Sequence, residues 1–132
     1  MRTLRRLALL FAVAATAVVP ALAAAHGDFA ARAAQPTFRQ GSLRLVGAGG
    51  YGTERRHQSI RVTVCLEKRY SGSFFTVKCK TAYDGDRRVR ARVGVAGCVR
   101  GTWRTTASGE ALGRAGNWTH GASAVSNPYR CS

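Results

Sequence analysis

The chain has few acidic residues. Its 132 residues include 6 Asp and Glu against 21 Lys and Arg, so the formal net charge is +15 at pH 7. So few carboxylates leave little material for paired acid and base catalysis. A GC-rich coding bias explains why most of the basic residues are Arg, but it does not remove Asp and Glu. The charge therefore indicates an anionic partner.

Catalytic and cofactor motifs are also absent. The sequence has no GxSxG elbow, no HExxH helix, no P-loop and no GxGxxG turn after a strand. The cysteines lack the CxxC pairs of a zinc site. The three histidines, His26, His57 and His120, belong to no recognisable catalytic set. We predict no enzymatic activity, no metal and no cofactor.

A long hydrophobic run occurs once, at the start. Arg2, Arg5 and Arg6 precede an uncharged segment, 7–25, which ends in the small residues ALAAA. This arrangement is typical of a secretory signal peptide. The run is too short and too rich in Ala to favour a permanent membrane span, and no second run of about 18 apolar residues follows. We expect residues 1–25 to be removed, leaving a secreted protein with no integral membrane span.

The four cysteines all follow this leader, and an even number in a short exported chain predicts two disulfides. A hairpin centred near Gly72 would place Cys65 opposite Cys79, which leaves Cys98 with Cys131. However, Cys79 shares a face with apolar residues and Cys65 shares a face with polar ones. A one-residue bulge would reconcile the two faces. Without a bulge, a bridge from Cys79 to Cys98 or Cys131 is the alternative.

The rest of the chain alternates apolar and polar residues and shows no helical period. We expect a flexible lead-in over 26–41 and one domain over 42–132, starting with a short edge strand at 42–46 and a Gly-rich loop at 47–52. Turn residues at 70–73 and 84–86 predict hairpins. Five further strands are predicted at 57–68, 74–83, 87–95, 102–107 and 117–125. This pattern predicts an all-β fold, a small Ig-like antiparallel β-sandwich.

The strand at 87–95 separates its side chains by charge. Val and Ala residues point one way, and an arginine ladder points the other way with about 6.6 Å between successive rungs. Arginine binds phosphate and carboxylate bidentately, so the ladder suits a polyanion. The alternative is a solvated face that blocks edge-to-edge pairing. The predicted binding residues are Arg88, Arg90 and Arg92 in the ladder, with Lys78 and Lys80 from the polar face of the preceding strand.

Segments around the cysteines resemble a class of small secreted actinobacterial proteins with two disulfides. The shared features are Cys65 within a strand, Cys79 at the end of the returning strand, and Cys98 shortly before the segment Gly101-Thr102-Trp103-Arg104. The resemblance covers about residues 58–131. It implies an Ig-like β domain and no particular activity. Both tryptophans, Trp103 and Trp118, are expected in the core.

These features together predict a secreted, non-catalytic binding or structural module. The expected partner is an anionic cell-wall or surface polymer, and nucleic acid is not expected. The alternative is a secreted serine protease inhibitor. Exported subtilisin inhibitors are similar in size and disulfide number, and Arg100 after the third cysteine would suit a trypsin-like enzyme. The proline that those inhibitors carry near the cleaved bond is missing here.

Overall fold

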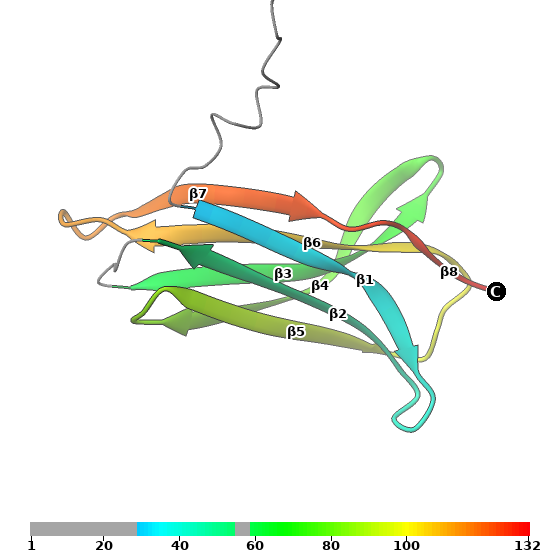
Figure 1. Ribbon diagram of the computed structural model, residues 1–132. Coiled ribbons are helices and arrows are strands. Elements are labelled where there is room, and N and C mark those ends of the chain that lie inside the picture. The colour runs from blue at the N-terminus through cyan, green and yellow to red at the C-terminus, as the bar shows by residue number, and fades with distance from the viewer. Residues whose placement is uncertain (1–28, 55–58) are drawn as a thin grey trace, which may run out of the picture.

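The computed structural model describes residues 29–54 and 59–132 (Figure 1). The predicted signal peptide, the start of the lead-in and His57 lie outside these residues. The described part contains strands and no helix, which confirms the all-β prediction. The strands are β1 (Phe29–Arg39), β2 (Arg44–Thr53), β3 (Ile60–Tyr70), β4 (Ser73–Asp84), β5 (Arg88–Ala96), β6 (Gly101–Leu112), β7 (Trp118–Val125) and β8 (Tyr129–Cys131).

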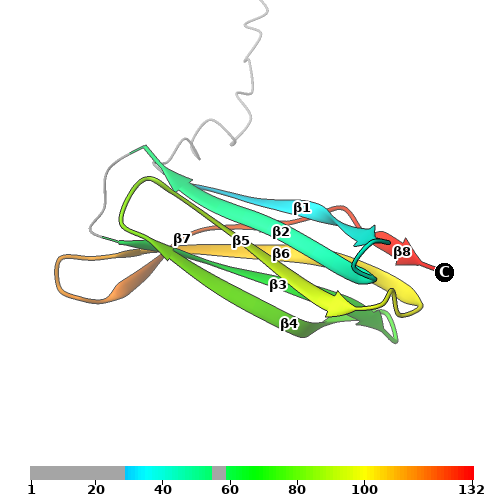
Figure 2. The same ribbon diagram turned by 90° about the horizontal axis from the view of Figure 1, so that it is seen from below.

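The strands form two antiparallel sheets that face each other as a sandwich (Figures 1 and 2). Sheet A has the order β1-β2-β5. Sheet B has the order β4-β3-β6-β7, and β8 pairs with β6. The core lies between the sheets and is built mainly from the inner faces of β3, β5 and β6. Its buried members are Leu45, Tyr51, Ile60, Val62, Val64, Leu66, Val89, Ala91, Val93, Trp103, Ala107, Ala111 and Cys131.

The strands with clear alternation fold as predicted. On β3, Ile60, Val62, Val64 and Leu66 are fully buried. On β5, buried Val and Ala residues alternate with exposed arginines. Burial of one face fixes the register, because a shift by one residue would expose every apolar side chain of the strand.

The predicted flexible lead-in is wrong for residues 29–39. These residues form β1, which pairs with β2 from Phe29↔Thr53 to Arg39↔Arg44. The alternation is hidden in the sequence because alanine occupies both faces of the strand: Ala31 is partly buried and Ala30 is exposed. A bulge between Ala34 and Thr37 interrupts the pairing. Both the Ala-rich composition and the bulge remove the period that would identify a strand.

The strand predicted at 42–46 is present from Arg44, but it is not an edge strand, and the loop predicted at 47–52 is wrong. Residues 44–52 belong to β2, which is the central strand of sheet A. Gly47 and Gly49 face sheet B at very close range. A Cβ on Gly47 would lie 2.8 Å from the Thr105 hydroxyl. The glycines are therefore needed where the sheets approach, and they give the strand no hydropathy signal.

Tyr51 is the large inward side chain on this glycine-rich strand. It is 2 % exposed, and a Cβ on Gly109 or Gly121 would overlap its ring. Gly109 lies within β6, so the segment predicted as a turn after residue 107 continues as strand and makes room for Tyr51. Desolvation by burial raises the pKa of the Tyr51 hydroxyl from 10.0 to about 12.

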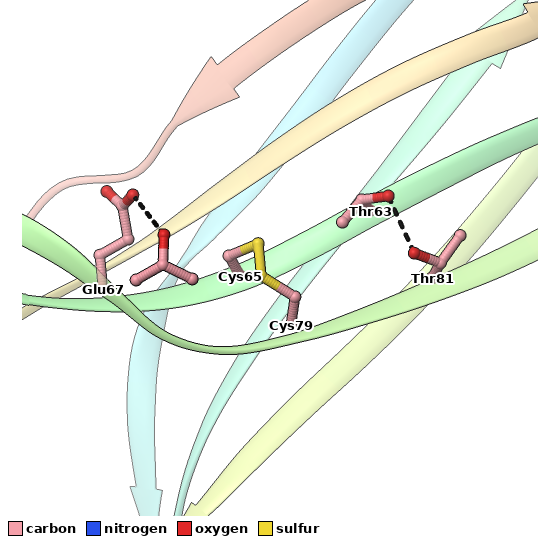
Figure 3. Close-up of a disulfide and its surroundings, with 6 residues drawn as sticks. Thr63, Cys65, Glu67, Cys79 and Thr81 are labelled. Carbon is pink, nitrogen blue, oxygen red and sulfur yellow. Dashed lines mark hydrogen bonds between the residues drawn. A yellow bond between two sulfur atoms is a disulfide. The ribbon is translucent and has the colours of Figure 1, made fainter. Parts of the chain in front are cut away.

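Both predicted disulfides are present, Cys65–Cys79 and Cys98–Cys131. The first joins directly paired residues of β3 and β4, with a Cα–Cα distance of 4.0 Å. On the same outer face, Thr63 bonds Thr81 and Glu67 accepts from Thr76 (Figure 3). The second disulfide ties the connection before β6 to β8, and Cys131 is buried.

A bulge in β4 explains how the cysteines meet. Leu66 pairs with Lys78 but Glu67 pairs with Thr76, so Val77 is an extra residue. The bulge places Cys79 on the outer face with Cys65. The predicted grouping of Cys79 with apolar side chains on one face is therefore wrong. The strand is an edge strand and is exposed along most of its length.

The two predicted hairpins differ in outcome. The turn at 70–73 is a tight hairpin between β3 and β4, with positive φ at Ser71 (49°) and Gly72 (86°). The segment after Asp84 instead carries the chain from sheet B to sheet A, since β4 and β5 are not paired. The Asp86 amide donates to the Asp84 carboxylate at 3.1 Å and closes a local turn.

The two disulfides should contribute unequally to stability. Closing a loop of 14 residues contributes about 3 kcal/mol on the loop-entropy estimate, and closing one of 33 contributes about 4 kcal/mol. Cys98→Ala/Cys131→Ala also removes a buried sulfur, so this variant should lose more unfolding free energy than Cys65→Ala/Cys79→Ala. Guanidinium unfolding under non-reducing conditions measures both losses. The reverse order would contradict the packing role of Cys131.

Stability should decline at alkaline pH because of Tyr51. Its folded-state pKa of about 12 lies above the ordinary tyrosine value of 10.0, so the contribution is complete below pH 10 and is lost as pH rises from 10 toward 12. The loss amounts to roughly 2 to 3 kcal/mol. Thermal unfolding between pH 9 and 12 should fall more steeply for the wild type than for Tyr51→Phe. Parallel curves would show that Tyr51 is not responsible.

Candidate anion-binding groove

The outer face of sheet A brings arginines from two strands around a strip of small residues. Register pairing places Gly50 of β2 between Arg32 of β1 and Arg90 of β5. The neighbouring rows are Ala30–Gly52–Arg88 and Ala34–Ala48–Arg92. Since opposite residues in a sheet share a face, the arginines stand on either side of a floor with almost no side chains.

This strip forms an open groove of about 700 Å³ along the strands. Its floor is Ala48, Gly50 and Gly52, and its β5 wall is the predicted ladder of Arg88, Arg90 and Arg92. Arg32 rises from the β1 side, and Glu54 lies at one end. The axes of β1 and β5 are about 10 Å apart, because two interstrand spacings separate them. The groove is therefore wide enough for one extended chain.

The arginines of the groove have no carboxylate partners within the described residues. Arg32, Arg88, Arg90 and Arg92 are all exposed, and none is in an ion pair there. Like charges on adjacent positions of one face repel each other, most strongly at low ionic strength. The groove consequently presents a concentrated positive potential with free guanidinium donors.

Two other arginines show the opposite behaviour on the outer face of sheet B. Arg61 bonds Glu110 at 2.5 Å and lies 4.2 Å from the Trp118 ring centroid. The hydrogen bond that Arg61 donates to the Glu110 carboxylate raises the pKa of Arg61 above its usual value. Arg104 bonds Glu67 at 2.6 Å. These two acidic residues offset the charges of Arg61 and Arg104 on sheet B, while the groove arginines of sheet A have no such partner among the described residues.

Arg44 adds a further guanidinium to the β5 side. Its side chain crosses from β2 and donates to the Gly94 carbonyl at 2.8 Å. A Cβ on Gly94 would lie 2.9 Å from the Arg44 Nε, so the guanidinium occupies the space that a side chain at residue 94 would fill. Position 94 follows Arg92 in the outward series. The ladder therefore continues with a fourth guanidinium supplied by another strand.

The structure confirms the outward orientation of Arg88, Arg90 and Arg92 but separates the two lysines from them. Lys78 and Lys80 pair with Leu66 and Val64, so they lie on the inner side of sheet B at its uncovered edge. Their expected continuity with the ladder is wrong, because a local pattern does not show that β4 and β5 belong to different sheets. Inward lysines on an edge strand discourage pairing with other chains.

Sequence reasoning missed Arg32 in the groove and Arg44 beside it. Arg32 lies in the segment expected to be flexible. Arg44 lies in the strand predicted at 42–46, whose neighbours the sequence does not give. The alternation of Arg44 with Leu43 and Leu45 was the available signal for its orientation. Pairing with Gly94 is a long-range property that no local pattern contains.

The two tryptophans and Arg100, to which the sequence also drew attention, lie outside the groove. Trp103 is buried as expected, and its indole donates to the Val99 carbonyl at 2.8 Å. Trp118 is not in the core but half-buried on the outer face of sheet B beside Tyr83, with ring centroids 5.9 Å apart. Arg100 is exposed at a bend between β5 and β6. The inhibitor alternative remains a prediction based on that exposure.

Within residues 29–54 and 59–132, no three His, Cys, Asp or Glu side chains gather as a metal site. The same residues contain no helix long and apolar enough to span a membrane. A comparison with known protein families finds no match to this sequence, and a comparison with curated proteins finds no significant similarity.

Removing one groove charge should not weaken the fold. Arg90→Gln relieves repulsion from Arg32, Arg88 and Arg92, so the unfolding temperature at low salt should stay the same or rise, with a free-energy gain of a few tenths of a kcal/mol. Arg61→Gln leaves Glu110 without its cation and Trp118 without its cation–π contact, so its unfolding temperature should fall. Thermal unfolding in 20 mM and 500 mM salt compares the two. Destabilisation by Arg90→Gln would indicate a structural role for that side chain.

Proposed function

We propose that the protein is a secreted binding module that holds an anionic cell-surface polymer in the groove of sheet A. The observation that carries the proposal is the set of exposed guanidinium groups on both sides of a side-chain-poor floor, which have no carboxylate partner in the part of the chain that the structure describes. Each guanidinium offers a planar fork of donors to phosphate or carboxylate oxygens. A polyanion bound there would relieve the repulsion among the arginines.

Protection of a sheet edge is the competing explanation for the ladder, and the distribution of charge argues against it. Edge protection needs charge only on the strand with free backbone groups. Arg32 and the ladder do lie on the edge strands β1 and β5, but Arg44 rises from the central strand β2. The arginines of both edges also face one groove across a floor of small residues. Ligand binding accounts for that distribution better.

Secretion is part of the proposal. The basic and apolar leader favours export, and two disulfides are typical of proteins in oxidising compartments. The strand order β1-β2-β5 against β4-β3-β6-β7 supports an Ig-like assignment and, with it, membership in the actinobacterial class that the cysteine segments resemble. Neither disulfide joins the two sheets, which departs from the bridge of antibody domains.

Charge location, rather than total charge, should control binding. Arg88→Gln/Arg90→Gln/Arg92→Gln removes three charges from the groove. The control Arg69→Gln/Arg114→Gln/Arg130→Gln removes three exposed charges that lie outside it. Affinity for heparin or purified teichoic acid should fall by about a hundredfold for the groove variant, and little for the control. The slope of log affinity against log salt should decrease by roughly 2 for the groove variant alone.

Two results would reject the proposal. Equal losses for the two triple variants would mean that the polymer responds to net charge and not to the groove. Retained affinity in the groove variant, with an unchanged unfolding temperature, would place the binding site elsewhere. The inhibitor alternative has its own test, which measures whether the protein inhibits trypsin or subtilisin. Inhibition by the wild type that is lost in Arg100→Gln would support that alternative.

A further inference from the structure

The floor of the groove restricts the shape of what it holds. Ala48, Gly50 and Gly52 contribute at most one methyl group each, so the bottom of the groove is nearly bare backbone. The strand axes on either side are about 10 Å apart, and arginines rise from both. A branched or folded polymer would meet the side walls before it reached the floor. An extended, unbranched chain fits along the strand direction.

The groove also lacks an aromatic surface. Among its described lining residues the aromatic one is Tyr51, which points into the core and is 2 % exposed. Nucleobases gain much of their binding energy by stacking on aromatic side chains, and ring-bearing ligands in general benefit from such faces. Here the recognition groups are guanidinium forks alone. The lining therefore favours a chain recognised by its charges.

The charged groups are regularly spaced. Successive positions 88, 90, 92 and 94 lie about 6.6 Å apart along β5. Arg44 supplies the guanidinium at position 94. Arg32 stands opposite the middle of this row. A chain with one anionic group per short repeat can therefore engage several forks at once. Phosphodiesters joined by short polyol units have this character.

We propose that the groove binds a single extended polyol phosphodiester chain, seated on the Ala48–Gly52 floor between Arg32 and a four-membered row completed by Arg44. This inference rests on the proposed function and specifies its ligand. Each phosphate accepts hydrogen bonds from a guanidinium fork, and the polyol spacers lie over the glycines. Glu54 at one end disfavours extension of the anionic chain past that end.

A larger side chain on the floor tests whether the polymer lies there, and it leaves the charge of the groove unchanged. Ala48→Leu places a side chain in the path of the polymer, and Ser123→Leu adds the same side chain on an exposed position of β7. Calorimetric titration with a glycerol-phosphate oligomer should show about tenfold weaker binding for Ala48→Leu and no change for Ser123→Leu. Unfolding temperatures verify that both variants fold. Unchanged affinity in a folded Ala48→Leu variant would show that the polymer does not lie on the floor.

Displacing Arg44 tests the fourth position of the row. Gly94→Ala puts a Cβ against the Arg44 guanidinium while keeping every charge. It should weaken glycerol-phosphate binding several-fold, about as much as Arg44→Gln, and the two effects should not add in the double variant because they remove the same contact. Additive losses, or no loss from either variant, would remove Arg44 from the site.

Three oligomers with the same number of negative charges test which class of ligand the groove prefers. The glycerol-phosphate oligomer should bind about tenfold tighter than a polygalacturonate oligomer or a single-stranded oligodeoxynucleotide. Tighter binding of the uronate or of the oligonucleotide would overturn the phosphodiester assignment. If the groove triple variant loses affinity but all probes bind equally, the proposed function stands and this inference fails.

Discussion

The close approach of the two sheets at β2 is the constraint on which the rest of the structure depends. Gly47 and Gly49 leave no room for a side chain between sheet A and sheet B, since a Cβ on either would lie within about 3 Å of atoms of its neighbours. Packing at this density lets β2 serve as the central strand of sheet A. Tyr51 then fills the wider space beyond, in contact with Gly109 and Gly121. The domain is thus held together by small residues as much as by large ones.

The same glycine-rich segment creates the groove on the opposite face. Successive residues of a strand point to opposite sides, so Gly47 and Gly49 belong to the core, while Gly50 and Gly52 belong to the floor. A stretch of small residues therefore has one face in the core and one face in the groove. A central strand is normally rich in β-branched residues. Because this one has small residues on both faces, its sequence predicts a loop instead.

How much of the molecule the sequence predicts depends on how local each feature is. The strands β3 and β5 were predictable because Ile60, Val62 and Val64, or Val89 and Val93, alternate with polar residues. The disulfide pairing followed from one hairpin. Strands β1 and β2 were missed because alanine and glycine carry no periodic signal. The groove was not predictable in the same way. It requires Arg32, Gly50 and Arg90 in one row, and this row forms only when three strands that are distant in sequence pair with one another.

The face that carries the ladder is electrostatically unfavourable for the free protein. With so few acidic residues, the chain places Glu67 and Glu110 against Arg104 and Arg61 on sheet B and leaves Arg32, Arg88, Arg90 and Arg92 without carboxylate partners among the described residues. Such an arrangement lowers stability, and two disulfides help to offset it. If the arginines served solubility alone, a dispersed arrangement would do so with less repulsion. The proposed binding of an anion would account for their concentration around a bare floor, because the anion would complete the charge balance.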